Sequence, residues 1–183
     1  MIYLSEMTLK EQKMVKKLYF DSFPKQERRP FWVLLKLRRK KFANLLVIHD
    51  EDSKKPVGIA FFIVRGNLVL FDYYAMLPEC RSKGYGSTAI EAIREYYKGK
   101  KIFGEVEAIC EEAPNNDQRI RRLNFYLRNG LCESGNFLYL FGVKMQILYF
   151  EDEAVSKEEY LEFQRGIFGD AYVERFIRLL PEQ

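Results

Sequence analysis

The chain has 183 residues, a length that suits one domain with a modest extension. Its hydrophobic content of 48% is ample for a packed core. No apolar run approaches the roughly 18 to 20 residues that cross a membrane, so we expect no membrane association. The net charge of +4 is mild and neither requires nor excludes a polyanionic ligand.

The three cysteines, Cys80, Cys110 and Cys132, are too few and too scattered for a disulfide framework or a zinc site. The single histidine, His49, could not complete a histidine-based metal site. The N-terminus has no apolar core of signal-peptide type, so export is not expected. These features predict a reduced, cytoplasmic protein without structural metal.

A short strand is predicted at 2–4, followed by a helix that begins with the T-x-x-E capping-box pattern of Thr8 and Glu11. The segment 22–30 breaks this helix, and Pro30 suits the first turn of a second one. The residues expected on the buried face of the first helix are Leu9, Met14, Val15 and Leu18. The later elements are strands 42–50, 56–65 and 68–77, a helix 87–97, a strand 101–109, a helix 118–128, and strands 138–145 and 146–151.

This order predicts an α/β fold with a mixed, mostly antiparallel sheet and a β-α-β crossover at 68–109. We expect one domain at 1–151 and a C-terminal helical extension at 152–183. In the extension, Ser156 and Glu159 form a capping box, and the helical pattern continues after Gly169 to Leu180. The extension could cover the sheet or make a contact in a homodimer.

The most informative run is 74–87, where an apolar strand stops at Pro78 and a short basic loop leads into a G-x-G that opens a helix. Such an arrangement gathers unpaired backbone N–H groups and the positive end of a helix dipole at one point. Arg81 and Lys83 add positive charge. The run therefore predicts a site for a phosphate or pyrophosphate.

Residues 84–89 also fit the G-x-G-x-x-G/A dinucleotide fingerprint, and Glu105 and Glu107 follow about 20 residues onward. That fingerprint requires the strand to run almost directly into the first glycine. Here Pro78 ends the strand early, and three strands precede the loop. The pattern therefore disfavours a dinucleotide.

The stretch R-S-K-G-Y-G at 81–86 resembles the [QR]-x-x-G-x-[GA] motif of the GNAT family of N-acetyltransferases. A second block at 119–131 resembles the family's F-Y-x-x-x-G-F helix. The resemblance implies an acetyl-CoA-dependent enzyme that moves an acetyl group directly to a primary amine of a small molecule or a peptide. It also implies that the strand ending near Leu77 splays from its neighbour at 101–109, with the pantetheine arm in the gap.

The resemblance assigns two groups of cofactor-binding residues. The backbone groups expected along the pantetheine arm are those of Ala75, Met76 and Leu77. The N–H groups expected around the pyrophosphate are those of Arg81, Ser82, Lys83, Gly84, Tyr85, Gly86 and Ser87.

Transfer requires an uncharged amine, so a base must take a proton directly or through water. Asp72 is the first candidate, and Glu107 and Glu105 are the others; each could instead be a rim carboxylate that binds the substrate cation or faces solvent. Tyr126 matches the family's tyrosine, which protonates the departing thiolate, although it could simply pack on a helix face.

Arg119 and Arg122 stand where many family members carry an asparagine and a small residue. They share a helical stripe with Tyr126 and could contact CoA phosphates or an anionic acceptor group, or face solvent. A non-catalytic CoA sensor with the same fold stays open. The basic run 36–41 reads as a solvated helix end, so no nucleic-acid partner is expected.

Overall fold

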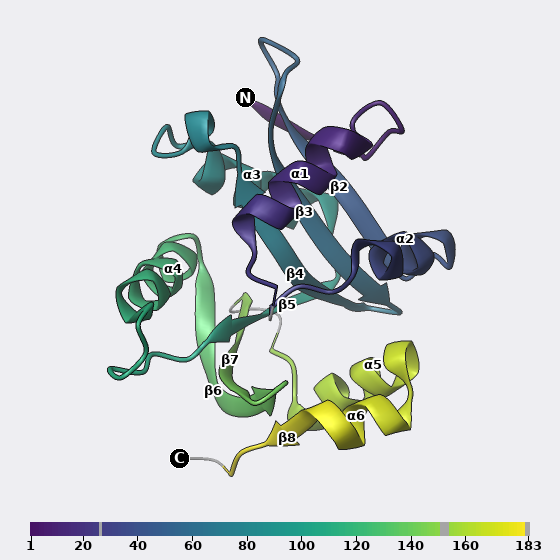
Figure 1. Cartoon of the computed structure of the whole chain (residues 1–183), viewed down its shortest axis with the longest axis vertical. Coiled ribbons are helices and arrows are strands. Elements are labelled where there is room, and N and C mark those ends of the chain that lie inside the picture. The colour runs from purple at the N-terminus through teal and green to yellow at the C-terminus, as the bar shows by residue number, and fades with distance from the viewer. Residues whose placement is uncertain (26, 151–153, 182–183) are drawn as a thin grey trace. The chain divides into compact units, whose positions relative to one another are not determined.

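The computed structural model describes residues 1–25, 27–150 and 154–181, which fall into two compact units. The first unit comprises Met1–Val64 and Phe71–Lys98, and the second comprises Arg65–Leu70 and Gly99–Gln183. Each unit has its own strands and helices, labelled in Figure 1.

The first unit is an antiparallel sheet covered by helices. Its elements are β1 (Ile2–Glu6), α1 (Gln12–Ser22), α2 (Phe31–Arg39), β2 (Ala43–Asp50), β3 (Pro56–Arg65), most of β4 (Leu68–Met76), and α3 (Tyr85–Tyr96). Strand β1 pairs antiparallel with β2, Ile2 lying opposite Asp50, and β2 pairs antiparallel with β3, Ala43 lying opposite Ile63.

Helices cover both faces of this sheet, because successive residues of a strand point to opposite sides. Tyr19 of α1 packs against Phe61 and Tyr73, with ring centroids 5.7 and 4.8 Å away. The next residue, Phe62, lies 4.8 Å from Tyr97 at the end of α3. Figure 1 shows α1 in front of the strands. Burial on both sides explains the uninterrupted apolar sequence of β3.

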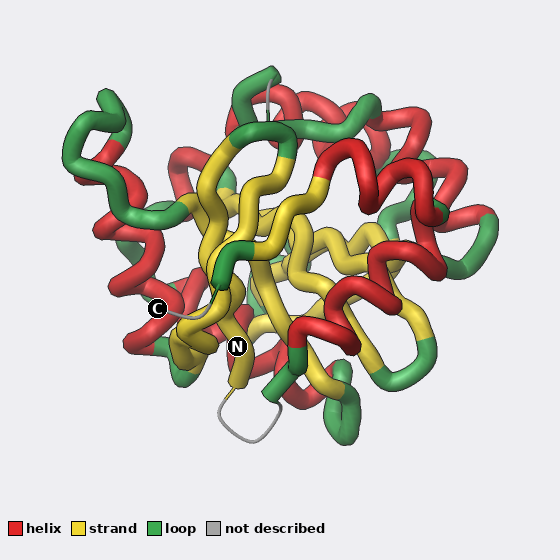
Figure 2. Tube along the Cα trace, turned by 90° about the horizontal axis from the view of Figure 1, so that it is seen from below, coloured by secondary structure: helices red, strands yellow, loops and turns green. Residues whose placement is uncertain are grey.

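The second unit has its own antiparallel strands. Its elements are β5 (Lys101–Glu107), α4 (Asn116–Arg128), β6 (Leu131–Leu140), β7 (Val143–Phe150), α5 (Lys157–Phe168), α6 (Asp170–Phe176) and β8 (Ile177–Leu179), coloured by type in Figure 2. Strand β7 pairs antiparallel with both β5 and β6, and β8 pairs antiparallel with β6.

The strand order is β1-β2-β3-β4-β5-β7-β6-β8, with β4 contributing residues to both units. The predicted mixed, mostly antiparallel α/β fold with a β-α-β crossover is therefore confirmed. The crossover consists of β4, α3 and β5.

The predicted start of the first helix is wrong by about one turn. Glu11 accepts hydrogen bonds from the Thr8 N–H and hydroxyl at 2.8 and 2.6 Å, but α1 begins only at Gln12. The two residues close a turn ahead of the helix rather than capping it. Leu9, which was expected on the buried face of the helix, lies in this turn instead and is 89% exposed.

Strands β6 and β7, which correspond to the strands predicted at 138–145 and 146–151, both begin earlier than predicted. The chain reverses at Phe141 and Gly142, whose φ angles of 51° and 82° are both left-handed, so β6 ends at Leu140. Residue 151, the expected end of the last strand, lies outside the described residues, as does the expected domain boundary at 151/152.

The C-terminal extension is partly helical, as expected, but it ends in a strand. The predicted capping box is confirmed, since Ser156 Oγ accepts from the Glu159 N–H at 3.1 Å and the Glu159 carboxylate accepts from the Ser156 N–H at 2.9 Å. The helical pattern predicted up to Leu180 is wrong beyond Phe176, because 177–179 pair with β6 as β8.

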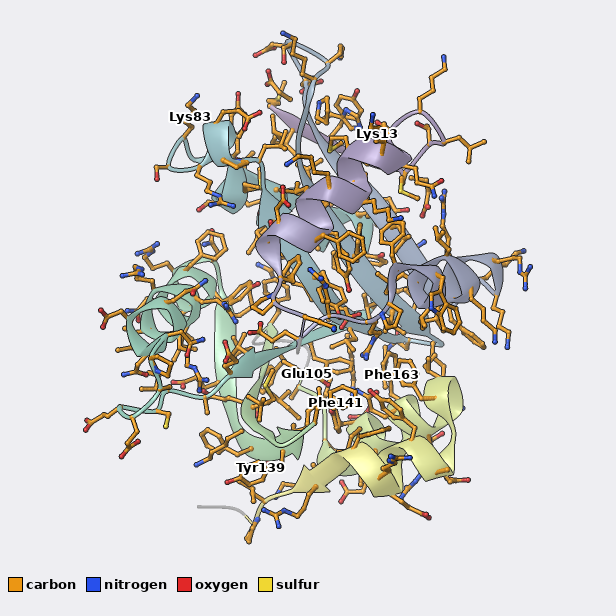
Figure 3. The ribbon with its side chains drawn as sticks, viewed as in Figure 1. Lys13, Lys83, Glu105, Tyr139, Phe141 and Phe163 are labelled. Atoms are coloured by element: carbon orange, nitrogen blue, oxygen red, sulfur yellow. The ribbon has the colours of Figure 1, made fainter. Side chains whose placement is uncertain are left out.

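Helix α5 is attached to β5 through a half-buried carboxylate. Glu105 accepts hydrogen bonds from the Tyr160 hydroxyl at 2.6 Å and from Gln164 Nε2 at 2.9 Å. Phe103 packs against Phe163 next to them, with ring centroids 5.2 Å apart. Figure 3 labels Glu105 and Phe163 on these two elements. Burial raises the pKa of Tyr160 well above its usual value, so the phenol remains a donor.

Tyr160→Phe should lower the free energy of unfolding by about 1–2 kcal/mol, because Glu105 loses one of its donors. Urea unfolding followed by circular dichroism measures this change. Tyr149→Phe, at a half-buried tyrosine of β7, is the matched control and should have little effect. Equal stability of both variants would contradict the assigned role of the Tyr160 hydroxyl.

Candidate functional site

The loop between β4 and α3 depends on two left-handed residues. After β4, the Leu77 N–H still donates to the Val57 carbonyl at 2.8 Å, and a short 3-10 turn follows at Pro78–Cys80. Ser82 and Gly84 then have φ angles of 58° and 82°. Glycine adopts such angles without strain, which suits Gly84 as the residue that precedes the first turn of α3.

This loop presents a row of unpaired donors. Within the described chain, the backbone N–H groups from Ser82 to Ser87 donate to no acceptor, and the first helical bond runs from Thr88 N to Gly84 O at 3.3 Å. A helix N-terminus carries partial positive charge at such a row. Arg81 and Lys83 are exposed next to it, and Lys83 projects from the loop in Figure 3. The arrangement favours an anion.

The end of β4 and the start of α3 are held in place by side chains of the first unit. The Tyr74 hydroxyl donates to the Gly86 carbonyl at 2.6 Å. On β3, a Cβ at Gly58 would lie only 2.7 Å from the Ala75 carbonyl oxygen and 2.8 Å from Met76 Sδ, so this close approach requires glycine. The backbone at 75–77, predicted to bind the pantetheine arm, is therefore closely packed against β3 just before the loop that carries the unpaired N–H groups of residues 82–87.

Asp72, a predicted base, lies buried on β4 beside a cation that the sequence did not assign to it. Its carboxylate is 3.5 Å from Arg29 Nε, and its side chain is only 8% exposed. Burial raises the pKa of Asp72, and the neighbouring Arg29 opposes that rise. The Arg29 backbone is itself held by two tyrosines, since its N–H donates to Tyr73 Oη and its carbonyl accepts from Tyr19 Oη, both at 2.9 Å.

Glu107, the second predicted base, is buried at the end of β5 and is held by two arginines. Its oxygens lie 2.7 Å from Arg119 Nη2 and 3.1 Å from Arg122 Nη1, and Asn115 Nδ2 donates to it at 3.3 Å. Arg119 also donates to the Ala108 carbonyl at 2.9 Å. The solvent-facing alternative for Arg119 is therefore wrong, because this side chain is 13% exposed and attaches α4 to β5.

Tyr126 lies one turn beyond Arg122 on α4 and is half-buried. Burial raises the pKa of Tyr126 to about 12, although the charge of Arg122 opposes this rise. The phenol therefore keeps its proton throughout the neutral range.

The predicted site residues fall into two groups. The first unit contains the loop residues 81–87, the strand end 75–77 and Asp72, while the second contains Glu107 and Tyr126. Their catalytic roles stay predictions. The sequence interpretation did not find the partners Arg29 and Asn115. The only signal for Arg29 was a pair of arginines just before Pro30, at the start of α2.

The described part of the chain shows no metal site, disulfide or membrane-spanning helix. No group of three His, Cys, Asp or Glu side chains there could hold a metal ion. The three cysteines are free thiols. None of the described helices is both long and apolar enough to cross a membrane.

The model of the acetyltransferase (GNAT) family matches residues 12–130, which include both the donor row and Tyr126. This chain belongs to the GNAT family. The match covers α1 to α4, so the predicted family is confirmed on the elements that carry the candidate site.

Several known proteins are similar to this GNAT chain. Bacillus subtilis YjbC, described as a candidate acetyltransferase, is 25% identical to this chain over 133 residues. The aligned part covers 69% of this chain and 66% of YjbC. This chain therefore spans just under two thirds of the length of YjbC. A Bacteroides thetaiotaomicron structure, described as a candidate GNAT acetyltransferase, has a TM-score of 0.72 at 22% identity, covering 92% of this chain and 97% of that one. A dodecameric spermidine N-acetyltransferase from Vibrio cholerae has a TM-score of 0.61 at 15% identity, covering 87% and 96%. At these identities the solved structures show the shared fold.

Glu107→Gln should lower the free energy of unfolding by about 3 kcal/mol, because two partly buried arginines lose their counter-charge. Chemical unfolding checks the value. The matched control is Glu111→Gln, at an exposed carboxylate, which should change stability little. An unchanged stability of Glu107→Gln would show that this carboxylate does not attach α4 to β5.

Proposed function

We propose that this protein is an N-acetyltransferase that uses acetyl-CoA and acetylates a primary amine of a small molecule or peptide. The observation that supports this best is the row of unpaired N–H groups from Ser82 to Ser87 at the start of α3 in a GNAT chain. The pyrophosphate of CoA is an anion that such a row accepts. Exposed Arg81 and Lys83 add to its attraction.

In the proposed reaction, the amine nitrogen attacks the thioester carbonyl, the new C–N bond forms and the C–S bond breaks. The CoA thiolate leaves and takes a proton, and the amine loses one. Tyr126 is the proposed donor to the thiolate. Its pKa of about 12 means that the phenol is still protonated when the thiolate forms.

Asp72 is better supported than Glu107 as the group that takes the amine proton, directly or through water. Burial raises its pKa, which makes the carboxylate a stronger base, and its Oδ2 accepts no hydrogen bond within the described chain. Glu107 already accepts from three side chains, so its oxygens are less available to a substrate amine or to water.

A CoA-binding protein without turnover is the second candidate, and the occupied Glu107 carboxylate is the observation in its favour. Thiol release from acetyl-CoA in the presence of amines separates the two candidates. The amine panel includes polyamines, aminoglycosides, amino acids and short peptides. Spermidine belongs in it because a structural neighbour is described as a spermidine N-acetyltransferase. Sedimentation of the same sample tests whether the chain forms a homodimer, one of the two roles expected for the C-terminal extension.

Saturating acetyl-CoA should raise the midpoint of thermal unfolding by about 5–10 °C, because the ligand binds only the folded state, and NADH should not. Gly84→Ala should remove most of the acetyl-CoA shift. Gly99→Ala is the matched control, since Gly99 has a φ of 79° against 82° at Gly84, and a Cβ would meet nothing within 4 Å at either position. Both variants carry about 1 kcal/mol of backbone strain, so only the ligand-dependent shift should differ. No shift of the unsubstituted protein with acetyl-CoA would contradict the proposal.

Tyr126→Phe should lower kcat for thiol release about a hundredfold while the affinity for acetyl-CoA stays nearly unchanged, because the ring is kept and the proton donor is lost. A DTNB assay with a responsive amine measures the rate, and calorimetry measures binding. Tyr96→Phe, at an exposed tyrosine of α3, is the control. An unchanged rate would limit Tyr126 to a packing role.

A further inference from the structure

One face of α2 points away from the sheet and has a distinct chemistry. The four residues that define this α2 stripe are Trp32, Leu35, Lys36 and Arg39, whose spacing of three, four and seven places them on one side of a helix. The opposite face, made of Phe31, Leu34 and Leu37, is buried in the first unit. The fold therefore uses the inner face and leaves the stripe at the surface.

The stripe exposes one large aromatic ring. Trp32, the single tryptophan of the chain, is 65% exposed. The four stripe residues line a surface hollow of about 360 Å³. The hollow is open to solvent, and the exposed indole that lines it offers an apolar contact with one polar N–H.

The two cations of the stripe are not used inside the described chain. Lys36 and Arg39 have no acidic partner there, and α2 itself has no acidic residue. Neighbouring cations differ in this respect. Arg38 pairs with Glu6 at 3.2 Å, and Arg28 donates to backbone carbonyls and stacks on a ring of α1. Lys36 and Arg39 next to the exposed Trp32 ring would favour a binding partner that carries both negative charge and an apolar group.

We propose that the α2 stripe docks a short acidic peptide segment of a partner protein. A large apolar side chain of that segment fills the hollow against Trp32 and Leu35, and its carboxylates pair with Lys36 and Arg39. The apolar part of the stripe, Trp32 and Leu35, favours an occupant with a large apolar side chain over a nucleic-acid backbone, whose binding relies on phosphate contacts. A hollow on one helix suits a single side chain better than a flat bilayer. The proposal is independent of the acetyl-transfer chemistry.

The test uses the intrinsic fluorescence of Trp32 in the full-length protein. The probe is a synthetic peptide in which Leu and Phe residues are spaced among Asp and Glu, with no tryptophan of its own. We expect a saturable change in Trp32 emission that weakens as salt is added. A second peptide with Asn and Gln in place of the acids should bind at least tenfold more weakly.

Charge reversal locates the site. Lys36→Glu combined with Arg39→Glu should weaken binding of the fluorescein-labelled acidic peptide at least tenfold in an anisotropy titration. Lys10→Glu combined with Lys13→Glu, at exposed positions before and within α1, makes the same change in net charge and should leave affinity within about twofold of the parent. Thermal unfolding of both variants verifies that they are folded.

Three results would overturn the proposal. They are failure of the acidic peptide to bind, an equal loss of binding in the two double variants, and tighter binding of polyuridylate RNA or of phosphatidylserine vesicles than of the peptide.

Discussion

Carboxylates on the inner strands of each unit require donors, because a buried charge without a partner is strongly destabilising. Three such groups lie on β4 and β5, and each faces a partner from a different part of the chain. Asp72 faces Arg29 from the connection between α1 and α2, Glu105 accepts from Tyr160 on α5, and Glu107 accepts from Arg119 on α4. Glu105 and Glu107 thus help to attach α5 and α4 to β5.

The need of a buried carboxylate for donors also distinguishes the three candidate bases from one another. Asp72, Glu105 and Glu107 share a residue type and a place near the ends of strands, which made all three candidates for a base. Their partners separate them. Glu107 is saturated by donors, whereas Asp72 combines burial, a raised pKa and one oxygen without a hydrogen bond, the combination expected of a group that accepts a proton.

Local patterns predicted those parts of the fold that depend on local physics. The loop before α3 could be placed because Pro78 restricts the backbone and Gly84 and Gly86 permit the tight turn into a helix, and the apolar strands could be placed by their composition. Strand β8 could not, because three residues have no period of their own and are extended only by pairing with β6. The partners of the acids were missed for the same reason. Helical spacing places Arg119 on a stripe, but only the folded chain brings it to Glu107.

The bond from the Tyr74 hydroxyl to the Gly86 carbonyl has a kinetic consequence. It joins the strand before the loop to the first turn of the helix after it, so the two ends of the loop are held together without a ligand. A loop that must fold around its ligand loses conformational entropy at the moment of binding, whereas this one loses it when the chain folds. An anion that binds at α3 as proposed would require no rearrangement of these two ends first, and the local positive field would speed its encounter with the loop.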